Sequence, residues 1–352
     1  MAGGTGGHIF PGLAVAEVLA GRGWRVVWMG LRTGMEAEIV PRNGYEMVWV
    51  NFQGVRGKGI EALIAAPLRL LRAMWQAAAA IRRVKPDVVL GMGGYVALPG
   101  GLMASLLNRP LVIHEQNAVA GTTTRLLAAV ADRVLTSFES AFKPRQRALL
   151  TGNPIRSVFT DKTGPAERFA RREGRLRLTV LGGSLGAKAL NEIVPQALAL
   201  LPEAARPEVT HQTGRQHVGA VRAAYAQVGV QARCESFIED MAAQLEASDL
   251  VVCRAGATTL AELAALGVAS ILVPFPHAID DHQTRNAQAL AGAGASILVP
   301  QAELTPDRLA GVLRSLDRPR LLEMACRARS LGRPQAAREV ADVCEQMAAG
   351  QR

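Results

Sequence analysis

Two short polar clusters in this sequence contain groups that could accept a proton. His8 follows the glycine-rich run GGTGG (residues 3–7), where that loop turns into a helical pattern. Glu115 lies in the cluster HEQN (residues 114–117), directly after a short apolar run. Histidine and carboxylate side chains are common general bases. A lone histidine is as often structural, and the HEQN cluster could form a helix cap and turn, so both residues are candidates only.

Glycine-rich turns before helical patterns are the second chemical signal. They are GGTGG (3–7), GGSLG (182–186) and AGATT (255–259). Such turns bring main-chain amides close to an anion, although a tight turn without a ligand is the alternative. The sequence has no dinucleotide fingerprint, no Gly-x4-Gly-Lys-Ser/Thr loop, no Asp-x-Asp and no His-Glu-x-x-His motif. We therefore expect no metal and no cofactor, and expect helix dipoles and arginines to stabilise negative charge.

The elements that position these groups alternate between apolar runs and helical patterns, which predicts parallel sheets covered on both faces. The predicted strands are Val26–Met29, Val88–Leu90, Leu111–Ile113, Val134–Thr136, Leu176–Leu181, Leu250–Cys253, Ile271–Val273 and Ser296–Val299. Predicted helices include Ile60–Arg83, Lys188–Leu201 and Thr305–Leu316.

The two halves of the chain repeat one order of motifs. Each has a glycine loop, then an Asp followed by three apolar residues, then a polar cluster, HEQN in the first half and DDHQ (280–283) in the second. We infer an α/β fold of two Rossmann-like domains that face each other across a cleft, spanning 1–157 and 158–334. A C-terminal helix over about 335–352 is expected to pack back on the first domain. Ligands bind such sheets at the carboxyl ends of strands, where these motifs lie.

Composition narrows the class of partner. The chain has 352 residues and a net charge of +10, mostly from arginine, which favours anionic partners. No helix-turn-helix or RNA-binding signature is visible, so we expect no nucleic acid. The four cysteines are far apart and are predicted to be buried thiols of a cytosolic protein. The uncharged stretch Val88–Asn108 holds five glycines and a proline, which predicts strand, loop and buried helix, not a membrane span.

One amphipathic segment has two interpretations. Its apolar residues are Ile60, Leu63, Ile64, Leu68, Leu71 and Trp75, and its basic residues are Arg56, Lys58, Arg69, Arg72, Arg82, Arg83 and Lys85. Most amphipathic helices of globular proteins turn their apolar face toward the protein core. The alternative is a face that lies on anionic lipid.

Several of these motifs, taken together, resemble those of a known protein family. The chain closely resembles the MurG family of bacterial transferases, from Met1 to near its C-terminus. The matching motifs are MAGGTGGH (1–8), RGKGI (56–60), PDVVLGMGGY (86–95), HEQN (114–117), GNPIR (152–156), GGSLGA (182–187), FIEDMA (237–242) and CRAGATTLAE (253–262). The resemblance implies a two-domain GT-B fold and transfer of N-acetylglucosamine with inversion, from UDP-N-acetylglucosamine to undecaprenyl-diphosphoryl-N-acetylmuramoyl-pentapeptide (lipid I), forming lipid II.

The resemblance also implies roles for residues. The Ile238 main chain would hold uracil, Glu262 the ribose and Gln283 the sugar hydroxyls. The segment His277–Asn286 matches the family more loosely than the rest, so the register that assigns Gln283 is fixed only to within about one residue. Ser184 and the turn Ala257, Thr258, Thr259, Leu260 and Ala261 would hold the donor diphosphate. Thr5, Gly6, Gly7, Asn117 and Arg156 would complete the donor site, and Gly93, Gly94 and Tyr95 would bind the acceptor diphosphate. Of the two candidate bases, His8 is favoured over Glu115 because histidine ordinarily titrates near neutral pH.

By the same resemblance the protein would act in peptidoglycan synthesis, as a peripheral protein on the cytoplasmic face of the bacterial inner membrane, bound to an anionic lipid surface. Cell wall biogenesis, cell shape, cell division and the cell cycle would depend on it. Two other functions stay open at this stage. One is a UDP-N-acetylglucosamine 2-epimerase with Glu115 as its acidic residue, and the other is a non-catalytic binder of lipid diphosphates.

The first glycine loop raises a separate expectation. In doubly wound domains a central strand usually precedes this loop, but only Met1 and Ala2 are available for it. We expect that the sequence starts a few residues downstream of its natural beginning. We also expect the chain to express poorly or melt early, with a mobile Gly3–Gly7 loop.

Overall fold

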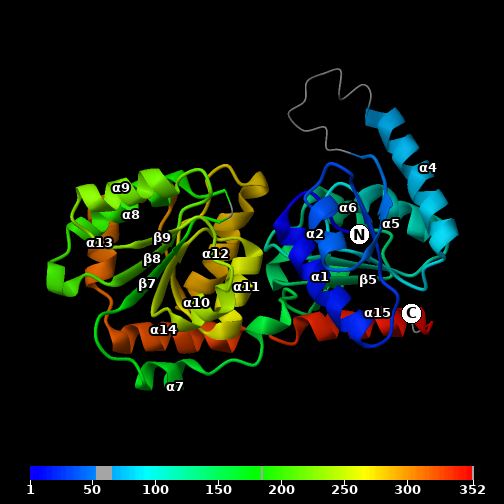
Figure 1. Cartoon of the computed structure of the whole chain (residues 1–352). Helices are drawn as coiled ribbons and strands as arrows, with labels where there is room; N and C mark the ends of the chain where they lie inside the picture. The colour runs from blue at the N-terminus through cyan, green and yellow to red at the C-terminus, as the bar shows by residue number, and fades with distance from the viewer. Residues whose placement is uncertain (53–65, 184, 351–352) are drawn as a thin grey trace. The chain divides into compact units, whose positions relative to one another are not determined.

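The computed structural model describes residues 1–52, 66–183 and 185–350, and its chain forms two compact α/β units (Figure 1). The first unit combines Met1–Ser157 with Pro334–Arg352, and the second is Val158–Arg333. Within the described ranges, no helix is both long enough and apolar enough to cross a membrane.

The second unit contains a six-stranded parallel sheet in the order β12-β11-β10-β7-β8-β9. Its strands are β7 (Arg177–Leu181), β8 (Glu208–Gln212), β9 (Arg233–Glu235), β10 (Leu250–Cys253), β11 (Ala269–Leu272) and β12 (Ser296–Leu298). Its helices are α7 (Pro165–Ala170), α8 (Lys188–Ala199), α9 (Val218–Gln227), α10 (Met241–Ala247), α11 (Ala257–Leu266), α12 (His282–Gly292), α13 (Pro306–Arg314) and α14 (Arg318–Leu331).

The strand order of this sheet reverses at its centre. β7 pairs with β8 on one side and with β10 on the other, and Leu181 lies beside Cys253 at the carboxyl ends of β7 and β10. The loops that follow these two strands therefore begin next to each other. Open α/β sheets bind ligands at such a reversal point.

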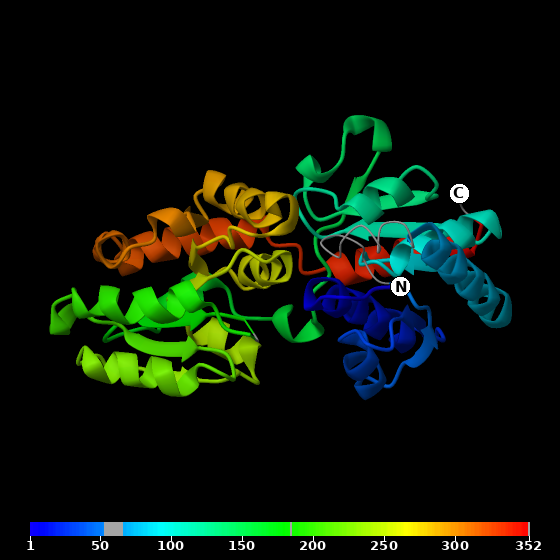
Figure 2. The same cartoon turned by 90° about the horizontal axis from the view of Figure 1, so that it is seen from above.

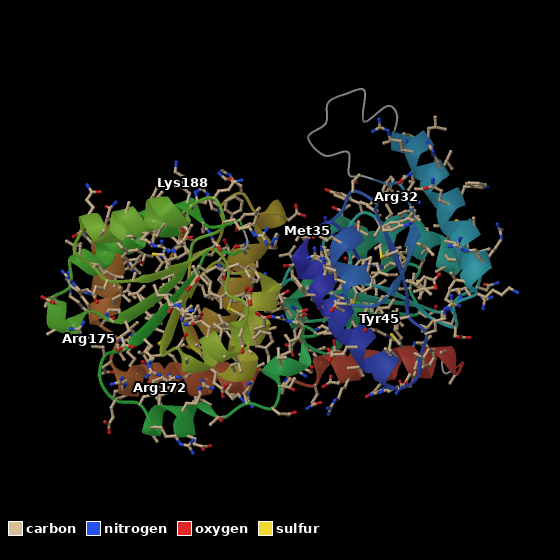
Figure 3. All side chains as sticks on the ribbon, viewed as in Figure 1. Arg32, Met35, Tyr45, Arg172, Arg175 and Lys188 are labelled. Carbon is tan, nitrogen blue, oxygen red and sulfur yellow. The ribbon has the colours of Figure 1, made fainter. Side chains whose placement is uncertain are left out.

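A buried ion pair fixes one end of this sheet. The Asp249 carboxylate, at the start of β10, accepts a hydrogen bond from the main-chain nitrogen of Arg177 at 2.8 Å. It also pairs at 2.5 Å with Arg172, which is labelled in Figure 3, and both side chains are buried. Arg172 donates further to the carbonyl oxygen of Ser248 at 2.7 Å. The pair is thus saturated by main-chain groups, as a buried charge requires.

The first unit contains two separate parallel sheets. One has the order β3-β4-β5-β6, and the other pairs β1 with β2. The strands are β1 (Val27–Gly30), β2 (Glu46–Trp49), β3 (Val89–Gly91), β4 (Leu111–Glu115), β5 (Arg133–Thr136) and β6 (Leu149–Leu150). The helices are α1 (Gly6–Gly21), α2 (Glu36–Arg42), α4 (Ala66–Val84), α5 (Ala97–Leu106), α6 (Thr122–Leu127) and α15 (Ala336–Ala348).

The chain start lies in a gap between these sheets. The Met1 amino group donates to the carbonyl oxygen of Leu90 at 2.8 Å, and the Met92 nitrogen donates to the Met1 carbonyl oxygen at 2.8 Å. These bonds give β3 one residue of strand pairing. In the second unit a full strand, β7, stands at the corresponding place between β8 and β10. Here β1 and β3 instead border a cavity of about 330 Å³, whose lining includes Val15, Leu19, Val27, Val88, Leu90 and Cys344.

The last helix completes the core of the first unit. α15 runs beside α1, as Figure 2 shows, and its residues Val340 and Cys344 are buried against Val15 and Val112. At the rim, Arg22 forms ion pairs with Asp342 at 2.7 Å and Glu345 at 2.6 Å.

The predicted strands are all present within a few residues, but four short ones were missed: β2, β6, β8 and β9. The prediction that HEQN follows its strand was wrong in detail, because β4 continues through His114 and Glu115. The prediction of four buried thiols was also wrong, since Cys326 is exposed on α14 while Cys234, Cys253 and Cys344 are buried. The predicted helix from Ile60 is described only from Ala66 onward, and the motif RGKGI lies outside the described residues.

Candidate active site

His8 is positioned by the first turn of α1. Thr5 has an extended backbone conformation, and its carbonyl oxygen accepts hydrogen bonds from the main-chain nitrogens of His8 at 3.1 Å and Ile9 at 3.2 Å. The helix thus starts at Gly6. Of the predicted donor residues, Gly6 and Gly7 contribute amides at the helix N-terminus, where negative charge is favoured.

A buried carboxylate, Glu36, holds the loop before this helix. Its Oε2 atom accepts from the Gly4 nitrogen at 3.1 Å, and its Oε1 atom accepts from the Leu31 nitrogen at 2.9 Å. Glu36 is fully buried, and a Cβ atom built on Gly3 would lie 2.4 Å from its Oε1 atom. Glycine at position 3 is therefore required by the close approach of this side chain.

A second glycine loop, after β3, packs on His8. A Cβ atom at Gly93 would lie 2.8 Å from His8 Nδ1, and one at Gly94 would lie 2.2 Å from the Gly3 carbonyl oxygen. Both residues have positive φ, 102° and 80°. The predicted acceptor-binding residues Gly93 and Gly94 are thus in direct contact with the segment of the candidate base, and Tyr95 beside them is 43% exposed.

The imidazole of His8 is half-buried and oriented by the loop after β4. Its Nδ1 atom lies 2.8 Å from Oε1 of Gln116, whose side chain is buried. The Gln116 amide nitrogen lies 3.0 Å from Nδ1 of His114 and 3.0 Å from the His114 carbonyl oxygen. His114 is fully buried, which lowers the pKa of its imidazole to about 4, so this ring is neutral at physiological pH.

Glu115, the other candidate base, is held in a different way. Its carboxylate is buried and accepts from the Asn117 main-chain nitrogen at 3.0 Å and the Gly121 nitrogen at 3.0 Å. The Asn117 side-chain amide adds a third bond at 3.2 Å. These three donors fix the turn from β4 to α6. Both oxygens of the Glu115 carboxylate therefore accept hydrogen bonds from its own turn, and His8 is the better placed of the two candidates.

Arg156 and Asn117 also belong to the first unit. The guanidinium of Arg156 lies 5.9 Å from the centroid of the Phe10 ring, a cation–π contact with the helix that carries His8. Asn117 is half-buried and follows Gln116 directly. Both residues are therefore attached to the elements around His8.

In the second unit, the predicted diphosphate turn forms the N-terminus of α11. The helix starts at Ala257 after an extended Gly256, so Ala257, Thr258 and Thr259 supply the first-turn amides, and Leu260 and Ala261 follow. Within the described residues, the buried Oγ1 atom of Thr258 has no hydrogen-bond partner. Glu262 is half-buried and lies on the second turn of α11, not on its first, because the helix already begins at Ala257.

The side chain of Gln283 forms hydrogen bonds with the loops that follow β10 and β11. Its Oε1 atom accepts from the Ala255 nitrogen at 3.2 Å and from the Phe275 nitrogen at 2.9 Å, which fixes the orientation of the amide. Only its NH₂ group can then donate to a ligand. Ile238 lies in the loop between β9 and α10 and is 9% exposed, and Ser184 lies outside the described residues.

Two contributors had little signal in the sequence. Glu36 is 32 residues from Gly4, which it anchors, and an acidic residue at a helix start ordinarily indicates only the helix dipole. Gln116 belongs to the HEQN cluster, but its spacing gives no hint that it contacts His8, 108 residues away.

Comparison with known proteins places this geometry in context. The glycosyltransferase family 28 N-terminal domain matches residues 1–136, and the family's C-terminal domain matches residues 177–345. A relative from Aromatoleum aromaticum is 59% identical over 100% of this chain and 98% of its own length. One from Dechloromonas aromatica is 58% identical over 99% and 98%. Both are named UDP-N-acetylglucosamine--N-acetylmuramyl-(pentapeptide) pyrophosphoryl-undecaprenol N-acetylglucosamine transferase.

Solved structures of glycosyltransferases have a similar fold. The crystal structure of Acinetobacter baumannii MurG has a TM-score of 0.86 and 41% identity, over 98% of both chains. The calicheamicin glycosyltransferase CalG4 has a TM-score of 0.66 at 17% identity, over 98% of this chain and 96% of that one, which shows the fold alone. The predicted α/β GT-B fold and the resemblance are confirmed by these matches. From its two matched domains and its close relatives over nearly their full length, the chain belongs to glycosyltransferase family 28.

Proposed function

We propose that this enzyme transfers N-acetylglucosamine from UDP-N-acetylglucosamine to lipid I, with inversion at the anomeric carbon. The observation that carries the proposal is identity of 55–59% with transferases named for this reaction, over nearly the whole of both chains. The site supports it, because a half-buried imidazole stands beside the glycine loop that the resemblance assigns to the acceptor diphosphate.

In the proposed reaction, His8 is the general base. Its Nε2 atom takes the proton of the acceptor hydroxyl, and the oxygen forms a bond to the anomeric carbon of the donor sugar. The bond from that carbon to the diphosphate oxygen breaks on the opposite face, so the centre is inverted and UDP leaves with the electron pair. The N-terminal amides of α11 would stabilise the charge on the diphosphate, and Glu262 would accept from the ribose hydroxyls.

The epimerase alternative is not favoured by the comparisons. A Listeria monocytogenes protein named as a candidate UDP-N-acetylglucosamine 2-epimerase has a similar fold at a TM-score of 0.64, but only 15% identity. Such a likeness concerns the fold and not the reaction. In this chain Glu115, the acidic residue considered for epimerisation, is already bound by three donors of its own turn.

The acceptor assay tests the reaction directly. The protein is incubated with UDP-N-acetylglucosamine and a short-chain lipid I, and products are identified by mass. We expect one added N-acetylhexosamine, none without acceptor, and a fall in turnover of roughly 10²–10⁴-fold for His8→Ala. A changed sugar in the absence of acceptor would identify an epimerase. Full turnover by His8→Ala would exclude His8 as the base.

We also infer that the protein binds the anionic face of the inner membrane through α4. Leu68, Leu71 and Trp75 form a stripe at i, i+3 and i+7, and are 73%, 63% and 72% exposed. Arg69 and Arg72 alternate with them and are exposed. The opposite side of α4 packs into the core through Ala73, Ala77, Ala80 and Ile81. Within the described part of α4, the three apolar side chains of this stripe are therefore exposed and do not contribute to the core of the first unit.

Vesicle co-sedimentation tests this surface. We expect binding to vesicles with anionic lipid, weakening with salt over the range in which the Debye length falls from about 10 Å to about 3 Å. The variant Leu71→Ser/Trp75→Ser should lose binding, while Leu106→Ser, an exposed leucine of α5, serves as the control. Equal binding to neutral vesicles at high salt would contradict the proposal. A peripheral position on the cytoplasmic leaflet, and a role in cell wall synthesis, shape and division, follow from this proposal and the proposed reaction.

A further inference from the structure

A chain of hydrogen bonds leads from His8 into the core of the first unit. It runs from His8 Nδ1 to Gln116 Oε1 at 2.8 Å, and from the Gln116 nitrogen to His114 Nδ1 at 3.0 Å. It ends at the Gly152 carbonyl oxygen, 2.9 Å from His114 Nε2. We propose that this relay fixes the tautomer of His8, so that Nδ1 carries the proton and Nε2 presents its lone pair. The catalytic consequence rests on the proposed role of His8 as base.

The orientation of the Gln116 amide follows from its main-chain partner. The amide nitrogen lies 3.0 Å from the carbonyl oxygen of His114, which can only accept. If the amide were flipped, two oxygen atoms would face each other at that distance inside a buried site. The nitrogen is therefore on the His114 side, and the oxygen faces His8.

Each proton in the relay is then determined. An amide oxygen only accepts, so His8 Nδ1 must be the donor to Gln116. The amide nitrogen only donates, so His114 Nδ1 must carry a lone pair. The neutral His114 ring then has its proton on Nε2, and donates it to the Gly152 carbonyl oxygen. Two main-chain carbonyl oxygens, of His114 and Gly152, can only accept hydrogen bonds. They therefore fix which atom is the donor in each bond of the relay.

This arrangement suits a base that works on a neutral hydroxyl. The ring nitrogen that is not bonded to Gln116 is the one able to take a proton from an acceptor. Gly93 packs closely against the imidazole, since a Cβ atom there would lie 2.8 Å from Nδ1, and this contact helps to hold the ring in place. Gln116 orients the ring without a negative charge. Gln116 and His114 are thus positioning residues, and they act through His8.

Nitrogen-15 NMR of histidine-labelled protein tests the tautomer in the wild type. We expect His8 to show a protonated Nδ1 and an unprotonated Nε2, and His114 to show the reverse. His8→Ala and His114→Phe assign the signals. A wild-type His8 protonated on Nε2 would overturn the proposal without any variant of Gln116.

Variants of Gln116 test the consequence. Gln116→Met keeps the length of the side chain and removes both polar atoms, so His8 should redistribute toward protonated Nε2. Turnover should fall roughly 10- to 100-fold with little change in the KM for lipid I. Gln116→Glu keeps an acceptor for Nδ1 and should recover part of that loss. Gln76→Met, at a half-buried glutamine of α4 that bonds the Asn51 nitrogen, is the matched control and should stay at wild-type turnover.

The double variant separates the relay from the proposed base. If His8 is the base, His8→Ala/Gln116→Met should be no slower than His8→Ala alone, because the two residues act as one unit. An additive loss would refute action through His8. Normal turnover by His8→Ala would remove the proposed base, while the NMR spectra would still decide whether the relay sets the tautomer.

Discussion

Adding a strand ahead of Met1 should stabilise the first unit strongly. The gap between β1 and β3 is bordered by apolar side chains, and Met1 already pairs with β3 through Leu90 and Met92. A five-residue extension rich in Val and Ile would continue this pairing in the direction of a parallel strand. A second extension of equal length, built from Thr and Ser, gains the same main-chain bonds and loses the same backbone freedom. The two therefore differ mainly in side-chain burial.

The magnitude follows from that difference. Each Val or Ile taken from water into the gap contributes roughly 1.5–3 kcal/mol. If three of the five side chains are fully covered, the apolar extension gains roughly 5–9 kcal/mol over the polar one. For a unit of this size about 1 kcal/mol shifts the melting temperature by roughly 2–4 °C. We therefore expect the apolar extension to melt at least ~10 °C above the polar one.

Tryptophan fluorescence makes the assay selective. The four tryptophans, Trp24, Trp28, Trp49 and Trp75, all lie in the first unit, so their emission follows that unit and not Val158–Arg333. Thermal scans of the chain and of both extended forms give the comparison. Equal midpoints for the two extensions would show that the side chains do not enter the gap, and the reasoning would fail.

Three further outcomes follow from buried polar groups. Met1 as a residue is only partly covered, but burial of its amino group lowers the pKa of that group to about 5 from the usual 8.0. The stability of the first unit should therefore fall by up to ~4 kcal/mol as the pH drops from 8 to 5. In urea titrations, N-terminal acetylation should abolish this pH dependence. Glu36→Gln turns one acceptor of the glycine loop into a donor and should cost about 1–3 kcal/mol by urea unfolding; an unchanged midpoint would mean that the loop is held otherwise. Asp249→Ala leaves Arg172 buried without its partner and should cost about 3–5 kcal/mol, whereas Glu167→Ala, in an exposed pair, should cost under about 1 kcal/mol by the same method.

The parts of the fold that the sequence predicts are those with strong local patterns. Strands such as Leu111–Ile113 and Leu250–Cys253 are apolar throughout because both faces of a parallel sheet are covered. β8 and β9 were missed because their sequences, EVTHQ and RCE, are largely polar. His211 in β8 is nevertheless fully buried, since Tyr225 of α9 supplies a partner for its Nδ1 atom at 3.0 Å. Such a compensation depends on tertiary contacts, which a local pattern does not contain.

The candidate site divides in the same way. Glycine loops and the HEQN cluster are visible because their composition is unusual, and the chain does bring His8, Gly93 and Gln116 together. The roles within the cluster were not predictable. Glu115 and Gln116 are adjacent and both polar, but one anchors its own turn and the other reaches His8. The choice depends on the direction that each side chain takes where β4 ends, and the sequence does not contain that information for buried polar residues.

The return of α15 to the first unit has a consequence for synthesis on the ribosome. Val158–Arg333 is continuous and can fold as soon as it has emerged from the ribosome. Val15 and Val112 of the first unit become buried only after Val340 and Cys344, near the end of the chain, have been synthesised. The half made first is thus the half completed last. A stop codon between Pro334 and Val340 would therefore spare the second unit and leave an apolar surface open on the first, a state that chaperones and proteases recognise.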